Sequence, residues 1–269
     1  MADTTSVTVG IVQAAAVIGD IDGNLRTLRQ GVNAAAELGA QVVVTPELFA
    51  TGYDPRTAWT HDGNAIRDEI SVAARDAGVA VVASTVDESS DASGRRRHIA
   101  ASFFDEAGEE IARIRKRHLF DIERNYFTPA DGYGEVFEWR GMRFGMGICY
   151  DVEYPEFVRT LAVNGAQILL VPTAVPKSPD GGGALAFSAS QSSTLLVPAR
   201  ALENGVAIAY ANHCADEFTA HSCIVNANGR FVDLIEDGAG IAVAEISATS
   251  IAEARALNPY LTDLERLLG

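Results

Sequence analysis

A glutamate, a lysine and a cysteine stand at the ends of three separate segments that have the pattern of β-strands. Glu47 lies in VVVTPEL, Lys116 in ARIRKRHL and Cys149 in RFGMGICY. A cysteine that attacks a carbonyl carbon needs a base to take its proton and a cationic or hydrogen-bonding group to stabilise the oxyanion. These three residue types supply that set, so the sequence predicts nucleophilic acyl transfer at a site built from strand ends.

Each of the three residues also has a structural explanation. Glu47 fits a surface carboxylate near a helix start, Lys116 an edge-strand cation between two arginines, and Cys149 a small core residue. The conjunction of the three favours chemistry. Lysine is also rare here, because the 21 basic residues comprise 19 arginines and only two lysines, Lys116 and Lys177.

Acidic residues follow the cysteine in ICYDVEYPE, and such a neighbourhood opposes thiolate formation. A turn after the strand sends successive side chains in different directions, so we expect that not all of these carboxylates face the thiol. An ammonium beside Cys149 is instead expected to lower the pKa of its thiol from about 8.5 toward neutrality.

Histidine is the common partner of a nucleophilic cysteine, and the chain contains five. His118 lies two residues after Lys116 and would share its face of a strand. A Cys149–His118 dyad is therefore the alternative arrangement. The neighbourhoods of His61, His98, His213 and His221 do not distinguish them.

Charge and cysteine content limit the partners and the compartment. The 269 residues carry a formal net charge of −15 with a pI near 4.7, which disfavours nucleic acid and anionic membrane surfaces. No apolar run approaches the roughly 18 residues of a membrane span, and MADTTSVTVG does not resemble a signal peptide. Three cysteines, Cys149, Cys214 and Cys223, match no disulfide or zinc pattern. We expect a cytoplasmic protein with reduced thiols and no metal.

Short β-branched runs alternate with amphipathic stretches, as in a layered α/β protein. Strands are expected at 6–13, 41–49, 78–85, 166–174 and 206–213, as two strands within 98–120, a hairpin over 135–150, and three strands within 222–247. Helices are expected at 24–39, 65–77, 155–164, 199–204 and 247–258. No linker divides the series, so we expect one domain, residues 1–269, with two sheets face to face and helices outside.

One long segment lacks periodicity. Residues 172–198 are rich in glycine, proline and serine, and long loops in compact domains are often functional. We expect this segment to be a lid over the site.

Five segments carry a family resemblance. TPELF, RKRHLF, ICYDVEYPE, GAQILLVPTA and ARALENGVAIAYAN resemble, in this order, the signatures of the nitrilase superfamily, the carbon-nitrogen hydrolases. The resemblance covers nearly the whole chain, and ARALNPYLTD resembles the ending of small aliphatic amidases within that superfamily. It implies an α/β fold, a four-layer αββα sandwich, assembled as a homodimer or higher homo-oligomer.

The resemblance also implies roles for individual residues. Glu47, Lys116 and Cys149 match the family's catalytic triad, and Glu123 matches a second glutamate that follows the lysine. True nitrilases tend to show Cys-Trp-Glu, whereas Cys149 is followed by Tyr150 and Asp151, as in the amidase branch. No metal or organic cofactor is implied.

The expected reaction is hydrolysis of a small aliphatic amide to a carboxylic acid and ammonia through a cysteine thioester. N-carbamoyl amino acids, ω-amides and nitriles are alternative substrates, and a non-catalytic binding protein is the alternative class, disfavoured because all three triad positions hold competent residues. The backbone N–H of Tyr150 is expected to assist Lys116 at the oxyanion. Candidate substrate-binding residues are Phe49, Tyr53, Tyr150, Thr173, Ala174 and Phe187. No arginine stands where a substrate carboxylate would require one, although Arg200 or a residue of the lid could serve.

Substrate identity rests on loops that depart from the family. The stretch GGGALAFSASQSS is unusual, and Ala220 and His221 stand where many relatives have glycine.

Overall fold

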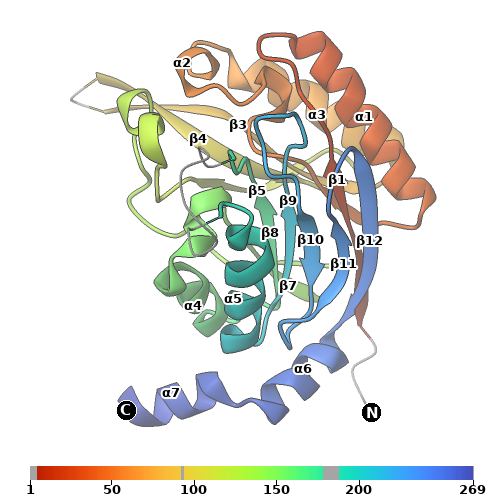
Figure 1. Ribbon diagram of the computed structural model, residues 1–269, viewed down its shortest axis with the longest axis vertical. Helices are drawn as coiled ribbons and strands as arrows, with labels where there is room; N and C mark the ends of the chain where they lie inside the picture. The colour runs from red at the N-terminus through yellow and green to blue at the C-terminus, as the bar shows by residue number, and fades with distance from the viewer. Residues whose placement is uncertain (1–4, 92–93, 178–187, 269) are drawn as a thin grey trace.

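Two stacked β-sheets form the centre of the molecule (Figure 1). The computed structural model describes residues 5–91, 94–177 and 188–268. Among these residues, twelve strands form two sheets with the orders β12-β1-β2-β3-β4-β5 and β11-β10-β9-β8-β7-β6. The first sheet contains β1 (Ser6–Gln13), β2 (Val42–Val44), β3 (Ala80–Asp91), β4 (Gly94–Phe104), β5 (Glu110–Arg115) and β12 (Gly240–Ser247). The second contains β6 (Phe137–Trp139), β7 (Met142–Met146), β8 (Ile168–Pro172), β9 (Ala207–Ala211), β10 (Ser222–Val225) and β11 (Phe231–Ile235).

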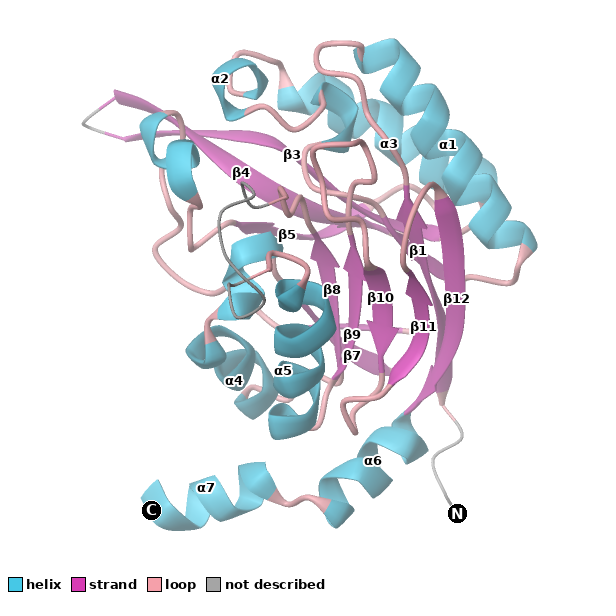
Figure 2. Cartoon of the chain, in the orientation of Figure 1, coloured by secondary structure: helices cyan, strands magenta, loops and turns pink. Residues whose placement is uncertain are grey.

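Helices cover the outer face of each sheet (Figure 2). Helices α1 (Ile21–Glu37) and α3 (Gly63–Ala77) pack on the first sheet, and α4 (Pro155–Val163) and α5 (Val197–Asn204) lie over the second. Short α2 (Pro55–Ala58) precedes α3, and α6 (Ala248–Leu257) and α7 (Tyr260–Leu268) end the chain. This is the αββα sandwich that the resemblance predicts.

Alternation along each strand builds two apolar layers. Val42 and Val44 face the second sheet, while Val43 faces the helices, and all three side chains are fully buried. Burial on both faces explains why β2 reads as a continuous valine run, as is usual for parallel strands inside a layered protein. Leu28 and Val32 of α1 pack into the outer layer.

Parallel strands at the middle of both sheets bring their carboxyl ends together. β1, β2 and β3 run parallel in the first sheet, and β7, β8 and β9 run parallel in the second. The segments that follow β2, β5, β7 and β8 meet at one edge of the sandwich, which is where α/β proteins build their sites.

Several boundaries differ from the expectation. β2 ends at Val44 and β7 at Met146, so Glu47 and Cys149 lie in turns beyond the strands. β3 and β4 form a long hairpin that reaches beyond the expected strand at 78–85, and α2 and α7 were not expected. In the expected loop 172–198, residues 178–187 lie outside the described residues, and helical structure begins at Gln191. Among the described residues, no helix has the length and apolar character needed to cross a membrane.

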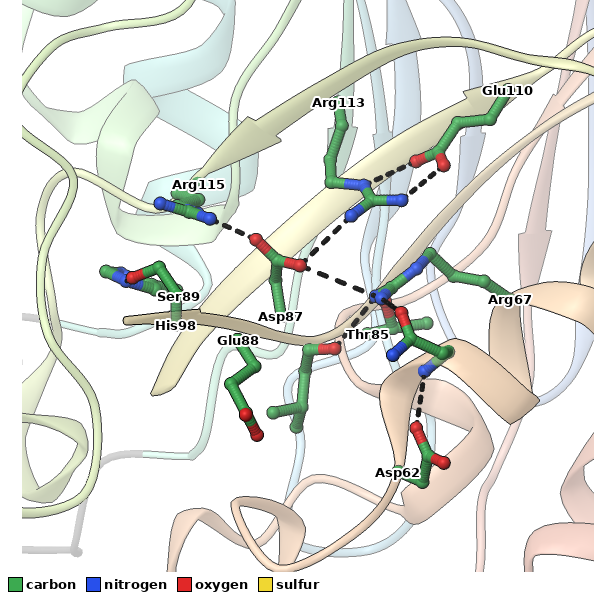
Figure 3. Close-up of polar contacts among 12 residues, drawn as sticks. Asp62, Arg67, Thr85, Asp87, Glu88, Ser89, His98, Glu110, Arg113 and Arg115 are labelled. Carbon is green, nitrogen blue, oxygen red and sulfur yellow. Dashed lines mark hydrogen bonds and ion pairs between the residues drawn. The ribbon is translucent and has the colours of Figure 1, made fainter. Parts of the chain in front are cut away.

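A cluster of charges ties β5 to β3 across β4 (Figure 3). Asp87 on β3 accepts hydrogen bonds from Arg115 (2.7 Å) and Arg113 (3.0 Å) on β5, and Arg67 of α3 lies 3.6 Å away. Burial alone would raise the pKa of Asp87, but the three arginines outweigh it and hold this pKa below its ordinary value. Because Arg115 directly precedes Lys116, the cluster fixes the strand that delivers the lysine.

Replacing Asp87 by asparagine is expected to lower the free energy of unfolding at pH 7 by about 1 to 3 kcal/mol, because one carboxylate serves three cations, two of them partly exposed. An acid with a depressed pKa stabilises the fold above its unfolded pKa, so the difference from wild type should shrink as the pH falls below about 4. Urea denaturation over a pH series measures both effects. Asp237→Asn, at an exposed carboxylate, is the control, and a constant difference across the series would contradict the prediction.

Candidate active site

The Lys116 ammonium lies between two carboxylates. Its Nζ donates hydrogen bonds to Glu47 Oε1 (2.8 Å) and Glu123 Oε1 (2.7 Å), and all three side chains are fully buried. The Tyr53 hydroxyl also donates to Glu123 Oε1 (2.7 Å). The structure therefore brings together the predicted glutamate and lysine, the second glutamate and one predicted substrate-binding tyrosine.

Backbone hydrogen bonds from both sheets position these side chains. The Lys116 N–H donates to the Ile99 carbonyl on β4 (2.7 Å), which extends the pairing of β5. The Glu47 N–H donates to the carbonyl of Thr173, directly after β8 (3.1 Å). This hydrogen bond joins the segment after β2 of the first sheet to the segment after β8 of the second. Glu123 lies in a 3₁₀ turn, η2 (Asp121–Asn125), where its Oε2 accepts from the Phe120 N–H (2.7 Å).

A buried histidine supports Glu47 from behind. His213 Nε2 lies 2.7 Å from the Glu47 carbonyl oxygen, and the ring stacks on Phe49 and Phe218. Burial lowers the pKa of His213 to about 4, although this hydrogen bond raises it, so the imidazole is neutral and donates its Nε2–H. His213 thus orients the main chain of Glu47.

Cys149 occupies a strained backbone position. It is the first residue of a 3₁₀ turn, η3 (Cys149–Glu153), with φ of 48°, a left-handed conformation that costs a non-glycine residue about 1 to 3 kcal/mol. Asp151 holds this turn in place, because its Oδ2 accepts from the Ile148 N–H (3.1 Å) and its Oδ1 from the His118 N–H (2.8 Å). The same carboxylate therefore joins the cysteine turn to the segment after Lys116.

The alternative Cys149–His118 dyad is not formed. His118 Nδ1 lies 3.0 Å from Asp151 Oδ1, and its ring stacks on Tyr154 with the ring centroids 3.8 Å apart. The histidine is engaged with Asp151 and an aromatic ring, not with the sulfur. The Asp151 carboxylate is engaged with the main chain of Ile148 and with His118.

Burial and neighbouring charges shift the acid–base properties of the cluster. Burial raises the pKa of Glu47 to about 8 against the lowering effect of Lys116, and Glu123 raises it further. Burial disfavours the Lys116 ammonium, but Glu123 and Glu47 outweigh this and raise its pKa above the ordinary range. Glu47 Oε2 is buried without a hydrogen bond among the described residues. The site thus holds a permanent cation and a glutamate whose second oxygen, Oε2, can carry or release a proton.

The thiol does not behave as the sequence predicts. Burial, reinforced by the Glu47 charge, raises the pKa of Cys149 above its ordinary value, and Lys116, the Thr173 hydroxyl and the Ala174 N–H offset this only in part. The expectation that the lysine brings the thiol pKa toward neutrality is wrong, because the loss of water and the Glu47 charge outweigh one ammonium. Cys149 is therefore a protonated thiol that needs a base when substrate arrives.

A cavity of about 340 Å³ opens beside Cys149. Apolar and aromatic groups make up much of its wall, namely Phe120, Tyr150, Ala174, Val175, Pro176 and Ala189. Four polar residues complete it, namely Asp121, Glu153, Lys177 and Ser192. The volume and the few polar groups are typical of a small-molecule site.

The predicted substrate-binding residues divide between this cavity and its surroundings. Tyr150 and Ala174 line it, and Thr173 lies fully buried next to Ala174. Tyr53 is hydrogen-bonded in the charged cluster, and burial raises the pKa of its phenol, which keeps it a neutral donor. Phe49 is not part of the cavity wall but packs between the first sheet and α1. Phe187 and the centre of the expected lid lie outside the described residues.

Two further expectations about the pocket change. Arg200 donates hydrogen bonds to Glu203 Oε1 (3.0 Å) and to the Glu153 carbonyl oxygen (2.9 Å). Its guanidinium is therefore engaged within the protein and is not positioned to bind a substrate carboxylate. Ala220 and His221, at positions where the resemblance suggests glycine, adopt left-handed φ of 56° and 57°, a conformation that glycine adopts without strain. Neither lines the cavity beside Cys149.

Sequence reasoning did not find Asp151, Glu153 or Ser192 as parts of the site. Glu153 had a signal, since it lies four residues after Cys149 in the acidic cluster. Ser192 lies 39 residues after Glu153, inside the segment 172–198 that was expected to be a lid, but nothing in that segment distinguished it from the neighbouring serines. Within the described ranges, no group of three or more His, Cys, Asp or Glu side chains is arranged to hold a metal ion.

Comparison with known proteins identifies the family to which this site belongs. The family model for carbon-nitrogen hydrolases matches residues 8–256. A "Hydrolase in pqqF 5'region" from Pseudomonas protegens is 31% identical over 91% of this chain and 84% of its own length. The 2-oxoglutaramate amidase of Bacillus subtilis is also 31% identical, over 84% of this chain and 86% of its own.

Solved structures extend the similarity to three dimensions. A cysteine-to-alanine variant of the Nesterenkonia AN1 amidase from the nitrilase superfamily superposes with a TM-score of 0.83 at 31% identity, covering 100% of both chains. Other structures of that amidase contain butyramide, or the acetamide moiety of fluoroacetamide added covalently to the active-site cysteine. The chain studied here belongs to the carbon-nitrogen hydrolases of the nitrilase superfamily and is a hydrolase that acts on carbon-nitrogen bonds.

Proposed function

We propose that this hydrolase cleaves small aliphatic amides to a carboxylic acid and ammonia through a thioester on Cys149. The observation that carries the proposal is the buried Glu47–Lys116–Glu123 cluster next to a protonated thiol that lines a small cavity. A base, a fixed cation and a nucleophile are the parts that acyl transfer needs.

In the first half of the cycle, Glu47 takes the thiol proton as the sulfur attacks the amide carbonyl carbon. Its raised pKa suits it to this transfer, because the raised thiol pKa would make a weaker base ineffective. The Lys116 ammonium and the Tyr150 backbone N–H stabilise the oxyanion. Glu47 then returns the proton to the departing nitrogen, the C–N bond breaks, and ammonia leaves.

In the second half, Glu47 activates a water molecule that attacks the thioester. The C–S bond breaks, the thiol regains its proton and the carboxylic acid leaves. Glu123 accepts hydrogen bonds from Lys116 and Tyr53 throughout, which keeps the ammonium at the oxyanion rather than in an exclusive pair with Glu47.

The solved relative supports an amide substrate. The Nesterenkonia amidase holds butyramide in one structure and a covalent acetamide moiety on its active-site cysteine in another. N-carbamoyl amino acids and ω-amides remain alternatives of the same reaction class, and nitriles a further one. The apolar wall beside Cys149 favours short aliphatic chains over these.

Ammonia release from a panel tests this function. We expect acetamide, propionamide and butyramide to release ammonia with the wild-type protein and not with Cys149→Ala. N-carbamoyl amino acids, carboxylate-bearing ω-amides and nitriles should turn over at least about tenfold less efficiently in kcat/KM, which corresponds to about 1.4 kcal/mol. A nitrile or an N-carbamoyl amino acid as the preferred substrate would contradict the proposal, as would silence on every amide.

We also propose that the protein forms a homodimer or higher homo-oligomer in the cytoplasm, and that nucleic acids and membranes are not partners. Exposed apolar side chains on α4, α6 and α7 support the assembly, namely Val163, Leu257, Tyr260 and Leu267. Val163 and Tyr260 line one groove of about 240 Å³. A second copy would remove this surface from water, and the three free thiols are compatible with a reducing compartment.

A further inference from the structure

One carboxylate in the cavity is not used by the reaction. Glu153 lines the same cavity as Cys149, four residues away on the same 3₁₀ turn, and its side chain is partly buried. The hydrogen bonds of the Lys116 ammonium go to Glu47 and Glu123, and Glu153 accepts none of them. A partly buried carboxylate in the wall of this cavity requires an explanation, because burial of an unpaired charge is costly.

The Glu153 carboxylate is fixed but only half satisfied. Ser192 Oγ donates to its Oε1 (2.9 Å), from a π-helical turn, η4 (Ser192–Leu196), of the kind that often marks functional sites. Oε2 accepts no hydrogen bond within the part of the chain that the structure describes, and it is not among the fully buried unpartnered atoms. One oxygen is therefore anchored and the other is free to accept a donor in the cavity.

A structural ion pair does not account for Glu153. The nearby guanidinium of Arg200 donates to Glu203 and to the main-chain carbonyl of Glu153, not to its carboxylate. Burial also raises the pKa of Glu153, which means that a cationic ligand would stabilise the ionised form. The carboxylate is placed to pair with something that enters the pocket.

We propose that Glu153 is a specificity-determining residue that selects amides bearing a positively charged amino group at the end remote from the scissile carbonyl. The inference rests on the proposed amidase function. Glu153 pairs with the substrate ammonium through its free oxygen while the amide carbon lies at Cys149. For the same reason it repels substrates that carry a carboxylate at that end.

Two other charged residues, Asp121 and Lys177, line the cavity, and both are exposed. Lys177 suggests the opposite preference and serves as the competing explanation. Lys177 makes no ion pair within the described ranges, and a free ammonium would attract a substrate carboxylate. Its side chain is exposed, however, whereas Glu153 is partly buried and hydrogen-bonded to Ser192. A fixed, partly desolvated charge discriminates more strongly than an exposed one.

Three amides of matched chain length distinguish these cases: pentanamide, 5-aminopentanamide and glutaramate. We expect wild-type kcat/KM, measured by ammonia release above a Cys149→Ala blank, to be at least about tenfold higher for 5-aminopentanamide than for pentanamide, and lowest for glutaramate. In Glu153→Gln, which keeps an acceptor for Ser192, the ratio of the first two values should fall about tenfold, mainly through KM. Glu156→Gln, at an exposed carboxylate on α4, makes the same charge change and should preserve the ratio.

Binding gives a readout that does not depend on turnover. Calorimetric titration of Cys149→Ala with 5-aminopentanamide should show an affinity that falls about tenfold when Glu153→Gln is added. A wild type that hydrolyses pentanamide and 5-aminopentanamide equally, or that prefers glutaramate, overturns this inference and leaves the amidase function standing. A preference that survives Glu153→Gln also overturns it. No release from any of these three amides overturns this inference, and it overturns the amidase function only when acetamide, propionamide and butyramide are silent as well.

Discussion

Cys149→Ala is expected to lose at least about ten-thousandfold in turnover on any amide that the wild type hydrolyses, because no acyl-enzyme can form without the sulfur. The remaining cluster of Glu47, Lys116 and Glu123 would still bind and polarise the amide. Substrate affinity should therefore be largely kept. Ammonia release gives turnover, and calorimetric titration with butyramide gives affinity.

The fold should tolerate this change. The substitution removes one buried sulfur atom. The left-handed backbone at position 149 is still held by Asp151, which accepts hydrogen bonds from the main-chain N–H groups of Ile148 and His118. The melting temperature is expected to stay close to that of the wild type. Cys214→Ala is the matched control, because Cys214 is a half-exposed free thiol away from the cavity, and it should retain full activity.

Mass spectrometry can detect the intermediate directly. Acid-quenched wild-type protein in turnover should carry the mass of the acyl group, and Cys149→Ala should not. Retained turnover in Cys149→Ala would place the nucleophile elsewhere. An acyl mass on another residue would do the same.

The positions of Glu47, Lys116 and Cys149 could be predicted because each residue follows a β-strand within a few residues, and the residue pattern of the strand is visible in the sequence. β-branched runs fix where strands lie, and parallel strands fix which ends meet. The sequence showed roughly how far each reactive residue lies from the end of its strand. The conformation of the turns could not be predicted, because the left-handed φ at Leu48 and Cys149 is imposed by tertiary contacts and is not marked by a glycine.

The electrostatics of the site could not be read from the sequence. The thiol pKa was expected to fall because a lysine was expected nearby, and the lysine does act in that direction. What the sequence conceals is that Cys149 and its neighbours are almost fully removed from water, so that burial is the largest effect. Burial arises from both sheets and the loops above them, which local pattern does not report.

The β3–β4 hairpin was underestimated for a related reason. Its outer half alternates charged and polar residues, such as Arg97 and Glu88, which form an ion pair 3.0 Å apart across the two strands. A strand with polar side chains on both faces has no period-2 hydrophobic signal, so its pairing becomes visible only when the partner strand is placed. Ser192 was missed in the same way, since only the fold brings it to Glu153.

Lys116→Arg is expected to lose at least about a hundredfold in kcat although it keeps the charge. Nζ is a compact donor that reaches Glu47 and Glu123 at 2.8 and 2.7 Å from a fully buried site. The planar guanidinium is larger and donates in a fixed fork, so it cannot occupy this space and present the same charge to the oxyanion. Losing one oxyanion donor costs about 3 kcal/mol or more in transition-state stabilisation.

Lys116→Met separates the loss of charge from the loss of shape. Without the ammonium, Glu47 and Glu123 face each other in a buried site, and the pKa of Glu47 should rise above its value of about 8, since Lys116 lowers it in the wild type. Glu47 acts as a base only when deprotonated. The acid limb of the kcat/KM profile should therefore move to higher pH in Lys116→Met, which measurements from pH 6 to pH 10 will detect.

Arg75→Met is the control for both variants, because Arg75 is an exposed cation on α3 that does not line the cavity. It should retain kcat on a neutral amide such as butyramide and the wild-type acid limb. Circular dichroism establishes that each Lys116 variant is folded before its kinetics are compared. Near-normal kcat in Lys116→Arg, or an unmoved acid limb in a folded Lys116→Met, would show that the ammonium between the two glutamates serves the fold and not the reaction.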